Sequence, residues 1–244
     1  MGYIGKKPTD APLTSSDVAD GIISNSKLAQ DIISGQTALA VAPADTDEFL
    51  ISDAGTLKRL DASLIGGGAW TFLQTVTASD DASVTIGSSS LFSSTYAVYK
   101  IFFNGVVPAT DSQTGNIRVS IGGAVKTDAY YTRVSMRTYS GGTGWSNTVS
   151  ESSTQLDRFF GTSVGSSTGE STNSEVTIYN PASTGKYKLI TTHGANVDAS
   201  KSATMNIDIG FYNNSTAAVD GIQFYFNSGN VASGTFRLYG LSKS

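Results

Sequence analysis

The sequence contains no cysteine among its 244 residues, which excludes disulfides, thiolate chemistry and Cys-ligated metal sites. Charged residues make up only 15% of the chain, and the net charge is −4. An acidic chain without a basic stripe has little to neutralise phosphates, so we expect no nucleic-acid partner. No apolar run approaches the ~18 residues that a membrane span requires, and the first residues lack the apolar stretch of a signal peptide. We therefore expect neither membrane insertion nor secretion.

Glycine, serine, threonine and asparagine are plentiful, and aromatic residues reach 10%. This mixture is typical of all-β proteins built from short strands and tight turns. From Trp70 onward, apolar runs alternate with turn residues and show no helical period. Strands are expected at Trp70 to Val76, Ser83 to Ile86, Tyr96 to Val107, Asn116 to Ile121, Tyr130 to Tyr139, Leu156 to Val164, Val176 to Tyr179, Tyr187 to Thr192, Thr204 to Tyr212, Gly221 to Phe226 and Thr235 to Leu241. The fold expected for residues 69–244 is an antiparallel β-sandwich resembling a jelly roll.

Alternation within two of these strands predicts which side chains face the core. Asn206 and Asp208 alternate with Met205, Ile207 and Ile209. Successive side chains of a strand point to opposite faces. We therefore expect the three apolar side chains to be buried and the two polar side chains to be exposed to solvent. Arg133 and Arg137 share one face of their strand with Ser135 and Tyr139, and we interpret these charges as a solvated face or as inter-subunit pairs. Trp70 is expected to fill part of the core.

Residues 1–35 have too few apolar side chains to build a core and are expected to form an extended arm. A near-repeat places the pair Ile22-Ile23 and the pair Ile32-Ile33 in similar surroundings. Three identical chains winding around a three-fold axis could bury these pairs, which favours a homotrimer; the alternative is a flexible linker.

Residues 36–68 contain two short apolar runs, Glu48 to Ser52 and Thr56 to Leu60, on either side of Asp53-Ala54-Gly55. This pattern predicts a β-hairpin, which we interpret as a small neck. A brief helical turn is expected at 61–65. The run Gly66-Gly67-Gly68 is the expected boundary with the sandwich.

Several strings resemble the fibre proteins of bacteriophage virions. Gly2-Tyr3-Ile4-Gly5-Lys6, the 13–17 run and the 48–61 hairpin resemble virion-attachment ends and shafts. The runs at 96–101 and 107–111 and the ending Gly234 to Leu241 are similar to jelly-roll-like domains at fibre tips. Together these cover most of the chain, and none is a catalytic signature.

The resemblance implies a homotrimer on the virion, made in the host cytoplasm, whose N-terminal arm docks to a tail, neck or capsid adaptor protein. Tyr3, Ile4 and Pro8 are the expected attachment residues, because aromatic, apolar and rigid side chains lose little entropy on docking. The C-terminal domain would bind a host-surface glycan or an outer-membrane protein. The alternative function is a capsid or neck decoration fibre that binds no receptor.

The 138–147 loop carries the expected ligand-binding residues, which are Tyr139, Trp145 and Asn147. Aromatic rings stack on sugar faces, and short polar side chains meet hydroxyls, so a host glycan is the expected ligand. Alternatively, Trp145 packs back onto the sandwich or onto a neighbouring subunit.

Catalysis and metal binding find little support in the sequence. The single histidine, His193, has no nucleophile motif nearby, so we expect a non-enzymatic protein without a cofactor. A glycan depolymerase would need a carboxylate pair, for which Glu151, Asp157, Glu170, Glu175 and Asp198 are the candidates. The acidic clusters at 45–48 and 80–81 lack the spaced loop of an EF-hand and are interpreted as solvated turns, so we assign no metal site.

Overall fold

The computed structural model describes residues 19, 23, 34–41, 43–44, 46–65 and 70–242. The chain divides into two compact units, 1–66 and 67–244. Tyr3, Ile4 and Pro8, the Ile22 and Ile32-Ile33 positions of the near-repeat, and the Gly66-Gly67-Gly68 run all lie outside the described residues.

The first unit contains the expected hairpin. Strand β1 (Glu48–Asp53) pairs antiparallel with β2 (Thr56–Asp61), and the 3-10 helix η3 (Ala62–Leu64) follows. The two turn residues Ala54 and Gly55 have φ of 49° and 83°. Two central residues with positive φ form the turn type that matches the twist of a hairpin, which explains why a glycine stands there.

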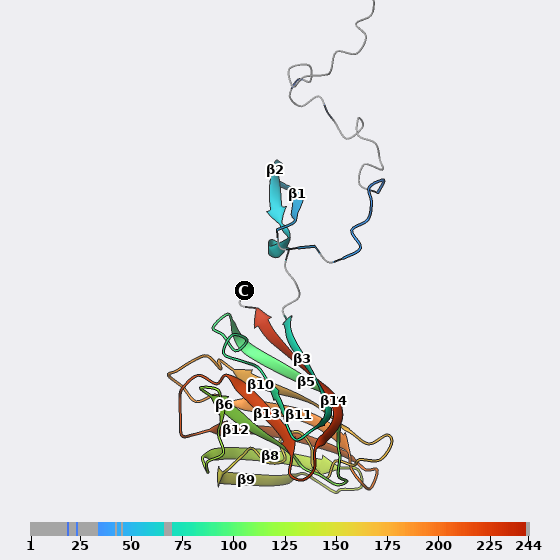
Figure 1. Ribbon diagram of the computed structural model, residues 1–244, viewed down its shortest axis with the longest axis vertical. Helices are drawn as coiled ribbons and strands as arrows, with labels where there is room; N and C mark the ends of the chain where they lie inside the picture. The colour runs from blue at the N-terminus through green and yellow to red at the C-terminus, as the bar shows by residue number, and fades with distance from the viewer. Residues whose placement is uncertain are drawn as a thin grey trace, which may run out of the picture. The chain divides into compact units, whose positions relative to one another are not determined.

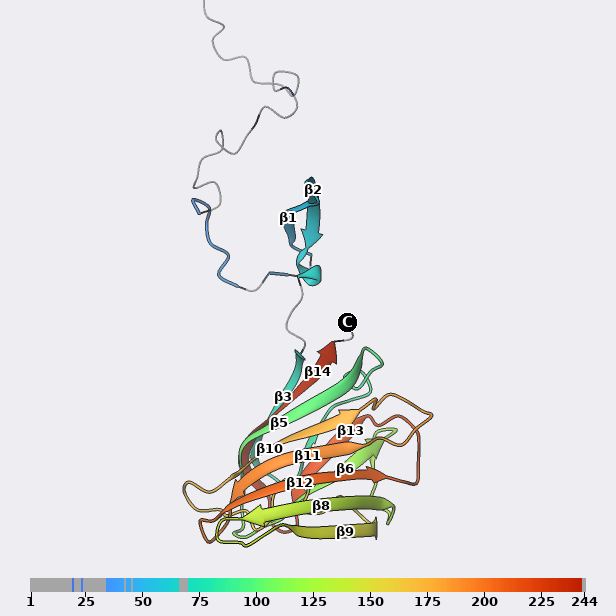
Figure 2. The ribbon, with the colours of Figure 1, turned by 180° about the vertical axis from the view of Figure 1, so that it is seen from behind.

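The second unit consists of strands arranged in two antiparallel sheets. Its strands are β3 (Trp70–Asp81), β4 (Val84–Ile86), β5 (Tyr96–Pro108), β6 (Gly115–Ile121), β7 (Ala124–Val125), β8 (Tyr131–Tyr139), β9 (Ser146–Ser153), β10 (Thr172–Tyr179), β11 (Ile190–Val197), β12 (Ala203–Tyr212), β13 (Gly221–Phe226) and β14 (Val231–Ser242). One sheet has the order β3-β14-β5-β10-β11-β12-β8-β9, and the other has the order β4-β13-β6-β7. Figure 2 shows the larger sheet in this order, and in Figure 1 strands β6 and β13 lie in front of it. The described residues therefore form an all-β protein compatible with a β-sandwich.

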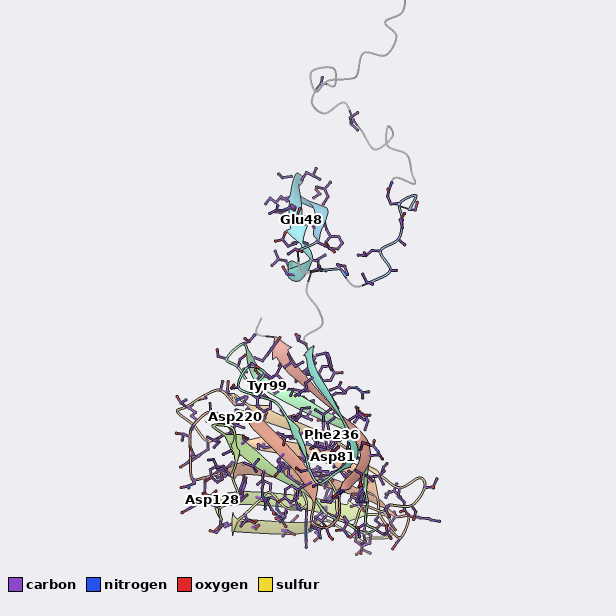
Figure 3. All side chains as sticks on the ribbon, in the orientation of Figure 1. Glu48, Asp81, Tyr99, Asp128, Asp220 and Phe236 are labelled. Carbon is purple, nitrogen blue, oxygen red and sulfur yellow. The ribbon has the colours of Figure 1, made fainter. Side chains whose placement is uncertain are left out.

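Aromatic side chains fill the space between the two sheets. The ring of Phe103 on β5 lies 4.6 Å from that of Phe224 on β13 and 4.9 Å from that of Phe236 on β14, centroid to centroid. All three side chains are at most 2% exposed, and Phe236 is labelled in Figure 3. Each fully buried aromatic side chain contributes about 1.5–3 kcal/mol through the hydrophobic effect. The core thus joins strands from both sheets.

The strand registers define two ends of the larger sheet. At one end, Trp70 begins β3 and pairs with Leu241. At the other end, β3 finishes at Asp81, which pairs with Val231 and is labelled in Figure 3. Propagating the register from strand to strand places Val197 and Ala203, which pair with each other, at the Asp81 end. Tyr139 lies at this end as well, because it pairs with Thr204.

One strand prediction was wrong, and strand β9 was not predicted. Residues 156–164 are not a strand but part of the 154–171 segment, in which Leu156 and Phe159 are fully buried. Arg158 and Ser163 have positive φ, which lies outside the extended region of regular strand backbone. Conversely, the polar residues 146–153 form β9 because they pair along β8.

The alternation of β12 and β8 is buried the opposite way from the prediction. Asn206 and Asp208 are at most 2% exposed, whereas Met205, Ile207 and Ile209 are 38–43% exposed. On β8 the supposedly solvated Arg133 and Ser135 are likewise buried. Strand register couples all these positions, because Ser135 pairs with Asp208 and so shares its face. The inward face of these two strands is therefore polar, and the alternation of apolar and polar residues does not determine which face is buried.

Trp70 does not fill the core. It is 39% exposed, and Nζ of Lys100 lies 5.5 Å from its ring centroid. Its position two residues before Phe72 places both rings on the face of β3 that points away from the core.

Candidate binding cavity

An interior polar cluster lies beneath strands β8, β11 and β12. It comprises Arg133, Ser135, Arg137, Thr192, Asn206 and Asp208, and all but Arg137 are at most 2% exposed. Nδ2 of Asn206 donates to Oδ2 of Asp208 at 2.7 Å. Six buried atoms of this cluster have no hydrogen-bond partner within the described part of the chain: Arg133 Nη1, Ser135 Oγ, Arg137 Nε, Thr192 Oγ1, Asn206 Oδ1 and Asp208 Oδ1. Such unsatisfied polar groups are costly, which points to a function other than stability.

Two charged groups of the cluster titrate abnormally. Burial raises the pKa of Asp208 to about 6, although the neighbouring Ser135 and Asn206 side chains oppose the shift. Burial also lowers the pKa of Arg137, and the nearby positive charges of Arg158 and Arg133 lower it further. Both shifts arise because the folded protein holds these charges out of water.

A cavity of about 250 Å³ adjoins the cluster at the Asp81 end of the sheet. It is lined by Arg137, Thr138, Tyr139, Ser146, Thr162, Ser163, Asp198 and Thr204. Arg137 belongs to both the cluster and the cavity, and Thr204 precedes Asn206 on the same face of β12. Tyr139 and Ser146 are exposed and form part of its rim.

Hydroxyl groups hold the Arg137 side chain in place. Its Nη1 donates to Oγ1 of Thr162 and its Nη2 to Oγ1 of Thr148, both at 3.1 Å. Arg137 makes no ion pair within residues 70–242. Oδ1 of Asp198 accepts from the backbone N–H groups of Ser200 and Ser202, which fixes this carboxylate at the cavity wall. The cavity thus combines a fixed donor, a fixed acceptor, hydroxyls and a tyrosine ring.

The structure brings only one of the three expected ligand-binding residues to the cavity. Tyr139 lines it and is 59% exposed. Trp145 is 46% exposed in the loop that joins β8 to β9, and it does not line the cavity. Asn147 pairs with Met136 on the opposite face of the sheet from Tyr139.

Sequence reasoning missed Arg137, Thr162, Asp198 and Thr204 as cavity residues. The available signal was the polar face shared by Arg133, Ser135 and Arg137, which matches the polar face of β12. Two neighbouring strands with polar alternate positions can indicate a polar interior as well as a wet surface.

His193 and three of the candidate carboxylates, Asp157, Glu170 and Glu175, have structural partners instead of converging on one site. Nδ1 of His193 lies 3.3 Å from Oε1 of Glu175, and Lys100 Nζ donates to Oε2 of Glu175 at 3.0 Å. Burial raises the pKa of Glu175, but the hydrogen bond and charge of Lys100 outweigh this effect and hold it below its usual range. Asp157 pairs with Arg133, and Glu170 accepts from the N–H of Ser167 at 2.8 Å.

Among the residues that the structure describes, no three or more His, Asp or Glu side chains gather as a metal site would need. Within that same part of the chain, no helix has the length and apolar character to cross a lipid bilayer. A scan against models of protein families gives no match, and neither the search of curated proteins nor the search of solved structures finds one.

Proposed function

We propose that this protein is a structural fibre protein of a bacteriophage virion, a homotrimer that attaches to the particle through its N-terminal arm and binds the host surface through its C-terminal domain. The N-terminal strings resemble the virion-attachment ends of phage fibre proteins, and strings in the C-terminal half resemble their tip domains. These resemblances support the proposed location on the virion. In this proposal residues 1–35 form the attachment arm, 36–68 the neck and 69–244 the tip.

Strand order supports a jelly-roll-like tip. In the larger sheet the first strand of the unit, β3, neighbours the last, β14, which neighbours β5. In the smaller sheet β4 neighbours the penultimate strand β13, which neighbours β6. Strands that alternate between two sheets in this nested order are characteristic of a jelly roll.

The observation that carries receptor binding is the cavity at Tyr139. It lies at the end of the sheet opposite Trp70, where the chain enters the second unit. A fixed guanidinium, a fixed carboxylate and several hydroxyls suit the hydroxyl groups of a sugar, and the exposed Tyr139 ring offers a stacking surface. The proposed ligand is therefore a host-surface glycan, bound weakly by each tip and strongly through avidity.

Adsorption to cells tests this function. Purified full-length protein should bind susceptible bacteria, leave resistant receptor-deficient bacteria unlabelled, and block infection by the phage. A protein that binds neither strain and leaves infection unchanged would instead be a capsid or neck decoration fibre.

The attachment arm has its own test. Deleting residues 1–12, which include Tyr3, Ile4 and Pro8, should prevent incorporation into virions while leaving cell binding by the soluble protein unchanged. Normal incorporation of the deleted chain would contradict the proposed role of these residues.

A glycan depolymerase is the less favoured alternative. The cavity contains one carboxylate, Asp198, among its lining residues. A hydrolase of the usual kind needs two. Release of reducing ends from host polysaccharide, abolished by Asp198→Asn, would favour the enzyme.

A further inference from the structure

The cavity at Tyr139 has a single cationic side chain, Arg137, among its lining residues. The Nη atoms of Arg137 donate to the hydroxyls of Thr162 and Thr148, and its Nε is buried without a partner in the part of the chain that the structure describes. A guanidinium offers five N–H donors in a planar fork, and a carboxylate is the acceptor that matches this fork best. Arg137 therefore has donor capacity that the described residues leave unused.

Hydrogen bonds from β11 fix the residue that orients Arg137. Nδ2 of Asn196 donates to the carbonyl oxygen of Thr162 at 3.0 Å, and the N–H of Thr162 donates to Oδ1 of Asn196 at 3.3 Å. Asn196 is only 3% exposed, so this link is shielded from water. A side chain that is already held in one orientation loses little entropy when a ligand binds. The guanidinium of Arg137 is thus prepared to receive a planar acceptor.

The charges around Arg137 leave an excess of positive charge. Burial lowers the pKa of Arg137, and two further arginines, Arg158 and Arg133, add to this effect. Asp208 and Asp157 oppose it. Three guanidiniums thus face two carboxylates in this group. Because buried charges in proteins are normally paired, a ligand that carries one negative charge would balance the group.

Asp198, the carboxylate at the cavity wall, is already engaged by the chain. Its Oδ1 accepts from the N–H groups of Ser200 and Ser202 at 2.9 Å and 2.8 Å. These bonds hold the carboxylate in a turn and partly satisfy its negative charge. Arg137, in contrast, has no carboxylate within ion-pair distance among residues 70–242. This difference favours an acidic sugar over an amino sugar as the ligand.

We infer that the cavity recognises a sugar acid, with the sugar carboxylate on the guanidinium of Arg137 and the sugar ring against Tyr139. The cavity volume of about 250 Å³ lies below the ~300–1,000 Å³ of sites for drug-sized ligands, which suits one monosaccharide residue. The hydroxyls of Ser146 and Thr204, which also line the cavity, suit the ring hydroxyls. A carboxylate carries a single charge and fits the charge balance better than a phosphate group, which carries about −1.5 to −2. This inference rests on the proposed function and names the class of its ligand.

Amidation of the ligand tests the inference in wild-type, full-length protein. Ligand-observed NMR titrations would compare glucuronate, galacturonate and mannuronate with the corresponding uronamides, which have similar shapes without the charge. At least one acid should bind roughly tenfold or more tightly than its amide, because a charge-assisted hydrogen bond is stronger than a neutral one. Equal affinities for every acid and its amide, no measurable binding of any acid, or a preference for glucosamine would overturn the inference.

Variants of the cavity locate the carboxylate. Arg137→Gln should abolish the preference for the acid over its amide, whereas Asp198→Asn should keep it. A folded Arg137→Gln protein that retains the preference would contradict the inference. Thr162→Val keeps the charge of Arg137 but removes a hydroxyl that orients it. This variant should weaken binding of the acid severalfold more than binding of the amide, and an acid-to-amide ratio equal to that of wild type would contradict the role of a fixed Arg137.

The outcome of cell adsorption separates this inference from the proposed function. Wild-type protein that adsorbs to susceptible bacteria but shows no preference for acids would keep the function and lose the carboxylate site. Wild-type protein that prefers acids through Arg137 but does not adsorb would keep the carboxylate site and contradict receptor binding. The same two readouts can be applied to host polysaccharide before and after amidation of its carboxyl groups, where amidation should weaken binding roughly tenfold or more.

Discussion

The Nε atom of Arg133 donates to Oδ1 of Asp157 at 3.0 Å and so joins strand β8 to the 154–171 segment. The Arg133 side chain is only 2% exposed, whereas Asp157 is 30% exposed. The buried cation therefore relies on a carboxylate that reaches it from the surface of the domain. Removing one member of a buried ion pair is costly because the other charge stays out of water.

Asp157→Asn should destabilise the protein by about 3–5 kcal/mol, the range for a buried charge that loses its partner. Arg158→Ala is the matched control, since Arg158 is 44% exposed and its Nε lies 3.8 Å from Asp157. That substitution should cost at most about 1 kcal/mol. Denaturant unfolding of both variants measures the difference, and equal losses would contradict the structural role of the Arg133 pair.

Asp208 should make the stability depend on pH. Its pKa of about 6 in the folded protein lies above the ordinary value of 3.8, so the folded state holds the proton more tightly than the unfolded state. The free energy of unfolding should therefore fall as pH rises through this window, by about 3 kcal/mol in total at 1.36 kcal/mol per pKa unit. Below the ordinary pKa of 3.8 Asp208 does not reduce the free energy of unfolding, and above its folded-state pKa of about 6 the reduction is constant.

The Asp208→Asn variant should lack this pH dependence. Unfolding in denaturant at pH 3.5 and at pH 7 should show wild type losing stability relative to the variant as pH rises. Asp80→Asn, at the exposed end of β3, is the control and should follow wild type at both pH values. If the free energy of unfolding changed equally with pH in wild type and in Asp208→Asn, the ionisation of Asp208 would carry no cost in stability, which would contradict this account.

Gly210 on β12 provides a test of packing between the larger sheet and the 154–171 segment. A Cβ at this position would lie 2.5 Å from Leu156 Cδ2 and 2.9 Å from the carbonyl oxygen of Thr132. Since the backbone oxygen cannot easily move, Gly210→Ala should cost about 1–3 kcal/mol. Gly185→Ala meets no atom within 4 Å and should leave the unfolding midpoint nearly unchanged. A neutral Gly210→Ala would indicate a looser contact with Leu156.

The fold class and most strands could be predicted because period-two alternation is a local property of the sequence. The hairpin at 48–61 was also predictable from local sequence, because a glycine-containing turn at Ala54-Gly55 separates two short apolar runs. Strand β9 could not be predicted, because its polar residues become a strand only by pairing with β8. The buried 154–171 segment was taken for a strand because its apolar residues resemble one, although their backbone conformation is set by the interior that they fill.

The cavity was the least predictable feature. Which face of β8 and β12 points inward is set by how the whole sheet packs, and alternation alone cannot distinguish the two faces. Tyr139 was found through its place in the glycine-rich loop, whereas Arg137, Thr162 and Asp198 come together only through the fold.

Titration with envelope polysaccharide from the susceptible host tests the central claim most directly. Wild-type protein should bind it saturably, and Tyr139→Ala should bind at least tenfold more weakly because the cavity loses its aromatic wall. Tyr187→Ala is the control, since Tyr187 is 49% exposed but precedes β11, at the opposite end of the sheet from the cavity. Unchanged binding by Tyr187→Ala with lost binding by Tyr139→Ala is the predicted result, whereas no binding by wild type, or equal binding by all three, would contradict a glycan site at the cavity.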